Sequence, residues 1–154
     1  MTRDEFIKKA DKKLKLIRIE GNYTQDKMAH ILGISKKTLV QIEKGRSSLG
    51  WAGAVTLCTI LRNSEVLEMT FGGQPQDLIL SLAFVGYESN YEKTLGGKVW
   101  WVNTESEGEF RIQQNIISQH YRILDGYNRR ICSSFDYEYI KKRLQELCSG
   151  SGGK

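Results

Sequence analysis

The chain has 154 residues, of which 40% are hydrophobic and 27% are charged, and its formal net charge is +5. This composition is typical of a globular protein and excludes a disordered or fibrous chain. No apolar run approaches the roughly 18 residues that a membrane-spanning helix needs, which excludes a helical membrane protein.

Lysine and arginine are concentrated at the start of the chain, where residues 1–50 hold 12 of them against 6 aspartates and glutamates. Such a basic segment attracts polyanions, as nucleic-acid-binding proteins do, although solvated helix faces explain the same charge equally well. The segment begins MTRDEFIKKADKK, which is charged where a secretory signal turns apolar. We therefore expect a cytoplasmic protein, in which the three widely spaced cysteines stay reduced.

The first seventy residues predict five short helices separated by turn signals. Apolar residues recur at spacings of three and four along the first helix, which ends at Gly21-Asn22. Thr24 and Ser35 are suited to cap the second and third helices, and Gly33 between them provides a tight turn. A fourth helix is expected over about residues 51–61 and a fifth from residue 63 or 64.

The segment FGGQP at residues 71–75 contains the single proline of the chain beside two glycines, which indicates a domain boundary. We therefore expect an all-α domain over residues 1–71. Residues 72–97 are expected to be a connecting segment. Within it, the apolar run from Leu78 to Val85 fits a short helix or a strand equally well.

After residue 97 the sequence becomes typical of β-structure. Residues 99–102 are rich in strand-forming side chains, and residues 109–116 alternate between polar and apolar ones. The run DGYN at residues 125–128 indicates a hairpin, and Ser134 or Asp136 can cap a final helix. These signals predict a small α+β module over residues 98–148, with three or four antiparallel strands and one helix. A flexible tail is expected over residues 149–154, and the fold class is α+β overall.

The segment TQDKMAHILGISKKTLVQIEKGR, residues 24–46, gives the clearest functional signal. A helix-turn-helix needs a short first helix, a tight turn and a second helix that presents side chains to the major groove of DNA. At about 100° per residue, one side of the second helix is polar and the opposite side holds Leu39 and Ile42. The polar side consists of Lys36, Lys37, Val40, Gln41 and Lys44. Lysine can donate to guanine and glutamine can pair with adenine, so this side is suited to reading bases.

The stretch from about Leu14 to Phe71 resembles the XRE family, the phage repressor and Cro-like helix-turn-helix domains, which fold as five short helices. The matching residues are Arg18, Thr24-Gln25, Ala29, Gly33 and Ile42-Glu43-Lys44-Gly45-Arg46. The resemblance implies base contacts by Lys36, Lys37 and Gln41. It implies DNA backbone contacts by Thr24, Gln25, Ser35, Lys44 and Arg46, and a structural ion pair between Arg18 and Glu43.

Two positions depart from the family pattern. Position 27 is lysine where the family commonly has an acidic residue, so the second helix lacks a capping box. Residues 47–51, SSLGW, replace the usual proline-containing lead into the fourth helix.

The sequence therefore predicts a transcriptional regulator, most simply a repressor, that binds double-stranded DNA. A homodimer is expected, because one recognition helix spans too few bases for useful specificity. Two other classes remain open: an antitoxin whose C-terminal module binds a toxin protein, and a ligand-sensing regulator with a pocket near Trp100, Trp101 and Phe110. No enzyme motif is found, so catalysis is not expected. No metal or cofactor is expected either, because the two histidines and three cysteines lack ligand spacing.

Overall fold

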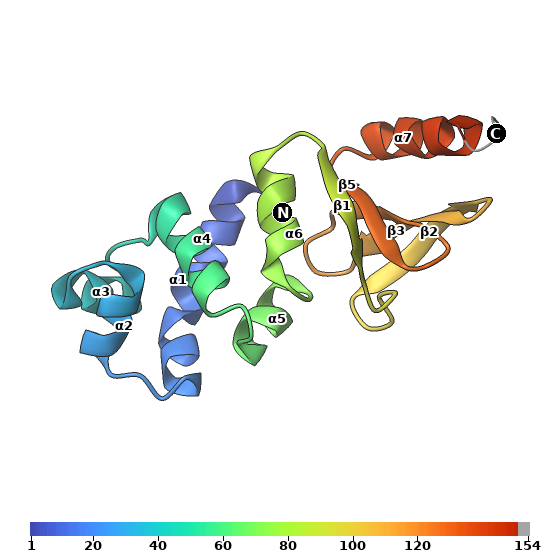
Figure 1. Ribbon diagram of the computed structural model, residues 1–154. Helices are drawn as coiled ribbons and strands as arrows, with labels where there is room; N and C mark the ends of the chain where they lie inside the picture. Colours follow the sequence, from blue (N-terminus) through green and yellow to red (C-terminus); the bar gives the residue numbers. More distant parts are fainter. Residues whose placement is uncertain (151–154) are drawn as a thin grey trace. The chain divides into compact units, whose positions relative to one another are not determined.

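The computed structural model describes residues 1–150, without the side chains of residues 90 and 92, and it divides into two compact units (Figure 1). Unit 1 comprises Met1–Gln76, and unit 2 begins at Asp77. Helices build unit 1, whereas unit 2 contains an antiparallel sheet and helices, which confirms the α+β fold class. Within the described part of the chain, no helix is both long enough and apolar enough to span a bilayer.

Unit 1 contains the five predicted helices. They are α1 (Arg3–Glu20), α2 (Gln25–Leu32), α3 (Lys36–Glu43), α4 (Gly50–Ile60) and α5 (Glu65–Phe71). Thr24, Ser35 and Ser64 cap α2, α3 and α5, because each side-chain oxygen accepts a hydrogen bond from the backbone N–H three residues further on. At the start of α1, Thr2 and Glu5 form a capping box that the sequence analysis did not include.

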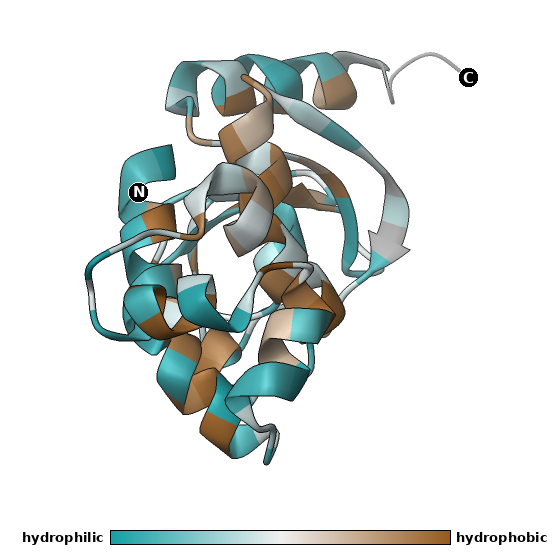
Figure 2. Ribbon diagram, turned by 90° about the vertical axis from the view of Figure 1, so that its left-hand side faces the viewer, coloured by the Kyte–Doolittle hydropathy of each residue, from teal (hydrophilic) through white to brown (hydrophobic). Residues whose placement is uncertain are grey.

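The core of unit 1 is built on the apolar side of α1. The ring of Phe6 lies 4.8 Å from that of Phe71 and 5.7 Å from that of Trp51, measured between centroids. Hydrophobic and hydrophilic residues alternate around these helices, as the brown and teal bands of Figure 2 show. The buried stripe of α1 consists of Phe6, Ala10, Leu14 and Ile17. Their spacing of three and four residues places them on one side of the helix, where burial stabilises the unit.

Unit 2 is a five-stranded sheet with a helix packed on one face. The strands are β1 (Tyr87–Lys93), β2 (Trp101–Glu107), β3 (Phe110–Asn115), β4 (Tyr121–Leu124) and β5 (Arg129–Ser134), in the order β1-β5-β4-β3-β2. Every neighbouring pair is antiparallel. Helix α6 (Pro75–Ala83) precedes the sheet and α7 (Tyr137–Gly150) follows it. Asp136 caps α7 by accepting from the backbone N–H groups of Glu138 and Tyr139.

The apolar core of unit 2 lies between the sheet and α7. Ile112, Ile123 and Cys132 are cross-strand neighbours on β3, β4 and β5, and they pack with Ile140 and Leu144 of α7. Burial raises the pKa of the Cys132 thiol to about 12, and it does the same for Cys58 in unit 1. Both thiols are therefore protonated and act as small apolar core groups.

The structure differs from the sequence analysis around the junction of the two units. The apolar run from Leu78 is helical up to Ala83, and the sheet contains a fifth strand, β1, drawn from residues 72–97. Strand β2 begins at Trp101, because residues 98–100 form a turn. Helix α7 reaches Gly150, two residues into the expected tail, whereas residues 151–154 of that tail lie outside the described residues.

Candidate nucleic-acid interface

Helices α2 and α3 are joined by a short turn whose geometry depends on Gly33. This residue has a φ of +67°, a left-handed conformation that glycine adopts without strain. The backbone N–H of Ile34 donates to the carbonyl of Ala29 at 3.0 Å and closes the end of α2. Ser35 then caps α3, so that α3 starts directly after the turn. The sequence TQDKMAHILGIS therefore encodes a helix, a tight turn and the start of a second helix.

The buried side of α3 fixes its orientation in unit 1. Leu39 is fully buried and Ile42 is 2% exposed, and on α2 Met28 and Ala29 are buried as well. Ala29, one of the residues that match the family, is 3% exposed, and its carbonyl accepts from Ile34 in the turn before α3. Because Leu39 and Ile42 are buried, the opposite side of α3 faces away from the core.

The outward side of α3 is polar. Lys36, Lys37 and Lys44 are exposed, and Gln41 and Val40 are half-buried. Lys36 and Lys37 also lie in the first turn of α3, where the helix dipole adds to their positive charge. The residues predicted to contact bases are thus accessible from solvent.

One ion pair on this surface was missed in the sequence analysis. The Nζ of Lys36 lies 2.8 Å from Oδ2 of Asp26 on α2, and both side chains are more than half exposed. An exposed pair of this kind contributes at most about 1 kcal/mol to stability. Asp26 nevertheless places a negative charge beside a lysine that is predicted to contact DNA. The sequence signal was present, because Asp26 lies in the first turn of α2, but its distance from Lys36 depends on the angle between the two helices.

The expected ion pair between α1 and α3 is present. Arg18 donates to Glu43 through Nε at 2.6 Å and through Nη2 at 3.2 Å, and the two side chains are 14% and 5% exposed. Gln25 adds a third hydrogen bond, from its Nε2 to Oε2 of Glu43 at 3.1 Å. Burial by itself would raise the pKa of Glu43, but the hydrogen bonds from Arg18 and Gln25 and the charge of Arg18 lower it below its usual value. Glu43 therefore stays ionised and links α1, α2 and α3.

The residues that are predicted to contact the DNA backbone fall into two groups. Thr24, Ser35, Lys44 and Arg46 are exposed, and they lie at the ends of α2 and α3. Gln25 is half-buried and its amide nitrogen is engaged with Glu43. In this structure Gln25 therefore supports Glu43, and its amide oxygen and second N–H are left to contact a partner.

The loop that departs from the family pattern is tied to α1. The backbone N–H of Leu49 donates to Oδ1 of Asp11 at 2.9 Å, and the N–H of Gly50 donates to Oγ of Ser48 at 3.0 Å. These two bonds fix the chain before α4, which has no side-chain cap of its own. Asp11 thus helps to hold the loop in place of the proline that the family commonly has there.

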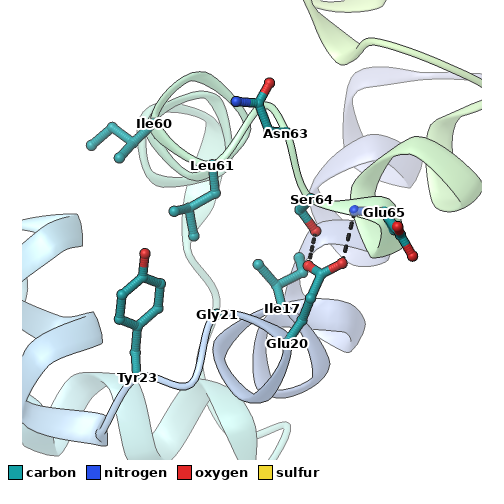
Figure 3. Close-up of a pocket in the computed structure, with 9 residues that line it drawn as sticks. All are labelled: Ile17, Glu20, Gly21, Tyr23, Ile60, Leu61, Asn63, Ser64 and Glu65. Carbon is teal, nitrogen blue, oxygen red and sulfur yellow. Dashed lines mark hydrogen bonds between the residues drawn. The ribbon is translucent and has the colours of Figure 1, made fainter.

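A hollow of about 540 Å³ in unit 1 is a weaker candidate for a ligand site (Figure 3). The carboxylate of Glu20 points at the start of α5, as the dashed lines in Figure 3 show. It accepts from the backbone N–H groups of Glu65 and Val66 and from the hydroxyl of Ser64. Capping α5 fully explains the carboxylate of Glu20, so this contact gives no reason to expect a ligand in the hollow.

In unit 2, two of the three aromatic residues expected around a ligand pocket, Trp101 and Phe110, lie on opposite faces of the sheet. Phe110 packs with the core under α7, whereas Trp101 lies against Arg122 on the other face of the sheet. His120 is buried, and its ring nitrogens lie 2.7 Å from Oδ2 of Asp77 and 2.6 Å from Oγ of Ser118. No group of three or more His, Cys, Asp or Glu side chains among the described residues could hold a metal ion.

Comparison with known proteins agrees with the geometry of unit 1. Residues 12–69 match the family described as a helix-turn-helix domain. Neither a curated protein nor a solved structure matches the chain. The matched residues run from α1 into α5 and include the whole of α2, the turn and α3. Unit 1 therefore contains a helix-turn-helix domain.

Proposed function

We propose that this protein is a sequence-specific transcriptional repressor that reads the major groove of double-stranded DNA with α3. The observation that supports this most directly is the outward side of α3, where Lys36 and Lys37 are exposed and Gln41 is accessible beside them. These side chains can donate to guanine and pair with adenine. Arg18 and Gln25 donate to Glu43 at the end of α3, which ties α3 to α1 and α2.

The protein acts as a homodimer in this proposal. A helix of eight residues such as α3 reaches only a few base pairs. Two copies on half-sites about one DNA turn apart double the number of bases that are read. Binding of such a dimer over a promoter would block transcription, and this is the basis for proposing repression.

A matched pair of lysine variants tests the role of α3. Lys36→Ala/Lys37→Ala and Lys8→Ala/Lys12→Ala each remove two exposed positive charges, the first pair from α3 and the second from α1. Affinity for a DNA site selected from a random pool is measured by fluorescence anisotropy. The α3 variant should lose most of its preference for that site over unrelated DNA, whereas the α1 variant should keep the preference. Equal loss of preference in both variants would contradict base reading by α3.

A further inference from the structure

One face of the sheet in unit 2 is buried although its side chains are polar. Asn103, Gln113, Arg122 and Ser133 are cross-strand neighbours that form a row over β2, β3, β4 and β5. Gln113 is 2% exposed, Arg122 is 6% exposed and Ser133 is fully buried. The adjacent row on the opposite face is apolar and packs on α7. Because buried polar groups destabilise a fold unless they are paired, this polar face needs a physical explanation.

Arg122 is the most unusual member of the row. Its Nε and Nη2 both donate to the same atom, Oε1 of Gln113, at 3.0 and 2.9 Å. Its guanidinium carbon lies 3.7 Å from the centroid of the Trp101 ring. No carboxylate among the described side chains forms an ion pair with it. A neutral amide oxygen thus takes the position that a carboxylate normally occupies beside a buried arginine.

Two further arginines increase the positive charge on this face. Arg130 and Arg111 both repel the charge of Arg122, while Asp77 attracts it. The carboxylate of Asp77 already lies 2.7 Å from His120, 2.7 Å from the hydroxyl of Ser133 and 3.2 Å from Arg130. Burial lowers the pKa of Arg122, Asp77 raises it, and the two neighbouring arginines lower it further. The result is a pKa of about 10. Arg122 is therefore still cationic at neutral pH, and its charge has no close anionic partner among the described groups.

The loop of residues 94–100 covers Arg122. A Cβ atom at Gly97 would lie 2.7 Å from Nη2 of Arg122 and 2.8 Å from Cβ of Trp101, and the residue has a φ of +71°, so glycine suits this close approach. The carbonyl of Gly96 accepts from Nε2 of Gln113 at 2.9 Å. Leu95 and Val99, in contrast, are 97% and 71% exposed. Because Leu95 and Val99 face solvent, their burial does not hold the loop closed, and the contacts that opening must break are mainly backbone hydrogen bonds such as that from Thr94 to Asn128.

We propose that Arg111, Arg122 and Arg130 form a binding site for a phosphate-type dianion, which enters when the loop of residues 94–100 opens. The dianion is inorganic phosphate or the phosphate group of a small metabolite. A guanidinium donates to two oxygen atoms of such a group at once, and the dianion supplies the close anionic partner that Arg122 lacks among the described groups. The site belongs to unit 2 and does not depend on DNA binding by unit 1.

Tryptophan fluorescence tests the site, because Trp101 stacks on Arg122. The full chain is titrated with inorganic phosphate and with phenyl phosphate, at an ionic strength kept constant with sodium chloride. We expect a saturable fluorescence change with at least one of them. A response to phenyl phosphate alone identifies a phosphorylated metabolite as the ligand class, and a response to both or to inorganic phosphate alone identifies the free anion.

Charge variants assign the binding to the arginine face. Arg122→Gln should weaken binding at least about tenfold, since it removes a charged hydrogen-bond donor. Arg62→Gln makes the same change at an exposed position of unit 1 and should bind as the parent does. Because loss of a buried arginine can disturb folding, the half-buried Arg111 provides a second variant, Arg111→Gln, which should also bind more weakly. No saturable response to either phosphate by fluorescence and calorimetry, or parent-like binding by both variants, would overturn the proposal.

Discussion

The ion pair between Arg18 and Glu43 provides a quantitative prediction about unit 1. Its two hydrogen bonds, at 2.6 and 3.2 Å, join α1 to the end of α3. Arg18→Ala removes both of them and leaves the carboxylate of Glu43, which is 5% exposed, with Gln25 as its remaining hydrogen-bonded side chain. Leaving a nearly buried charge without its counterion costs about 3 kcal/mol, at the low end of the range because Arg18 keeps some contact with water.

This loss should be visible as a large change in unfolding temperature. For a unit of 76 residues, about 3 kcal/mol corresponds to a fall of roughly 12–24 °C. Circular dichroism follows the helices of unit 1, and urea titration gives the free energy of unfolding. Arg62→Ala, at an exposed position, is the control and should change that free energy by less than about 0.5 kcal/mol.

A double variant separates the buried charge from the lost packing. Arg18→Ala/Glu43→Gln removes the positive charge together with the negative charge that it would leave unpaired. We expect it to be more stable than Arg18→Ala alone, because no buried charge is then left without a partner. If Arg18→Ala unfolds within about 0.5 kcal/mol of the parent, the pair does not hold α3 in place and the reasoning is wrong.

Two further predictions concern single charged groups. Asp26→Asn releases Lys36 from its 2.8 Å ion pair, so affinity for the selected DNA site should rise a few-fold, because Lys36 is then free to donate to a base. An unchanged affinity in anisotropy titrations would show that Asp26 does not restrain Lys36. Burial would raise the pKa of Asp77, but its bonds to His120 and Ser133 and the nearby charges lower it to about 2. Its contribution, about 2 kcal/mol, should therefore be complete above pH 4 and be lost as the pH falls towards 2. Urea titrations at several pH values measure this loss, and the same acid dependence in Asp77→Asn would count against it.

The local signals of unit 1 predicted its structure well for physical reasons. Thr24, Ser35 and Gly33 determine where helices begin and end through contacts within a few residues, so they can be read from the sequence. The orientation of α3 follows from Leu39 and Ile42, because helical periodicity places them opposite the lysines. The pair between Asp26 and Lys36 could not be predicted in this way, since it depends on how α2 and α3 pack.

Unit 2 was predicted less completely, because its arrangement depends on contacts between distant residues. The apolar run from Leu78 has no periodicity that separates a helix from a strand, and the structure makes it helical. Strand β1 pairs with β5, about forty residues later, and only that pairing identifies it as a strand. The polar row around Arg122 could not be seen either, because its members meet only when four strands align.

The central claim is that α3 reads DNA bases, and selection of bound sites from a random DNA pool tests it most directly. The parent protein should select two half-sites related by two-fold symmetry and about one DNA turn apart. Gln41→Ala should select a consensus that is relaxed at one defined position in each half-site, with a discrimination loss of about 1–3 kcal/mol there. Failure of the parent to select any consensus, or an identical consensus for Gln41→Ala, would contradict the claim.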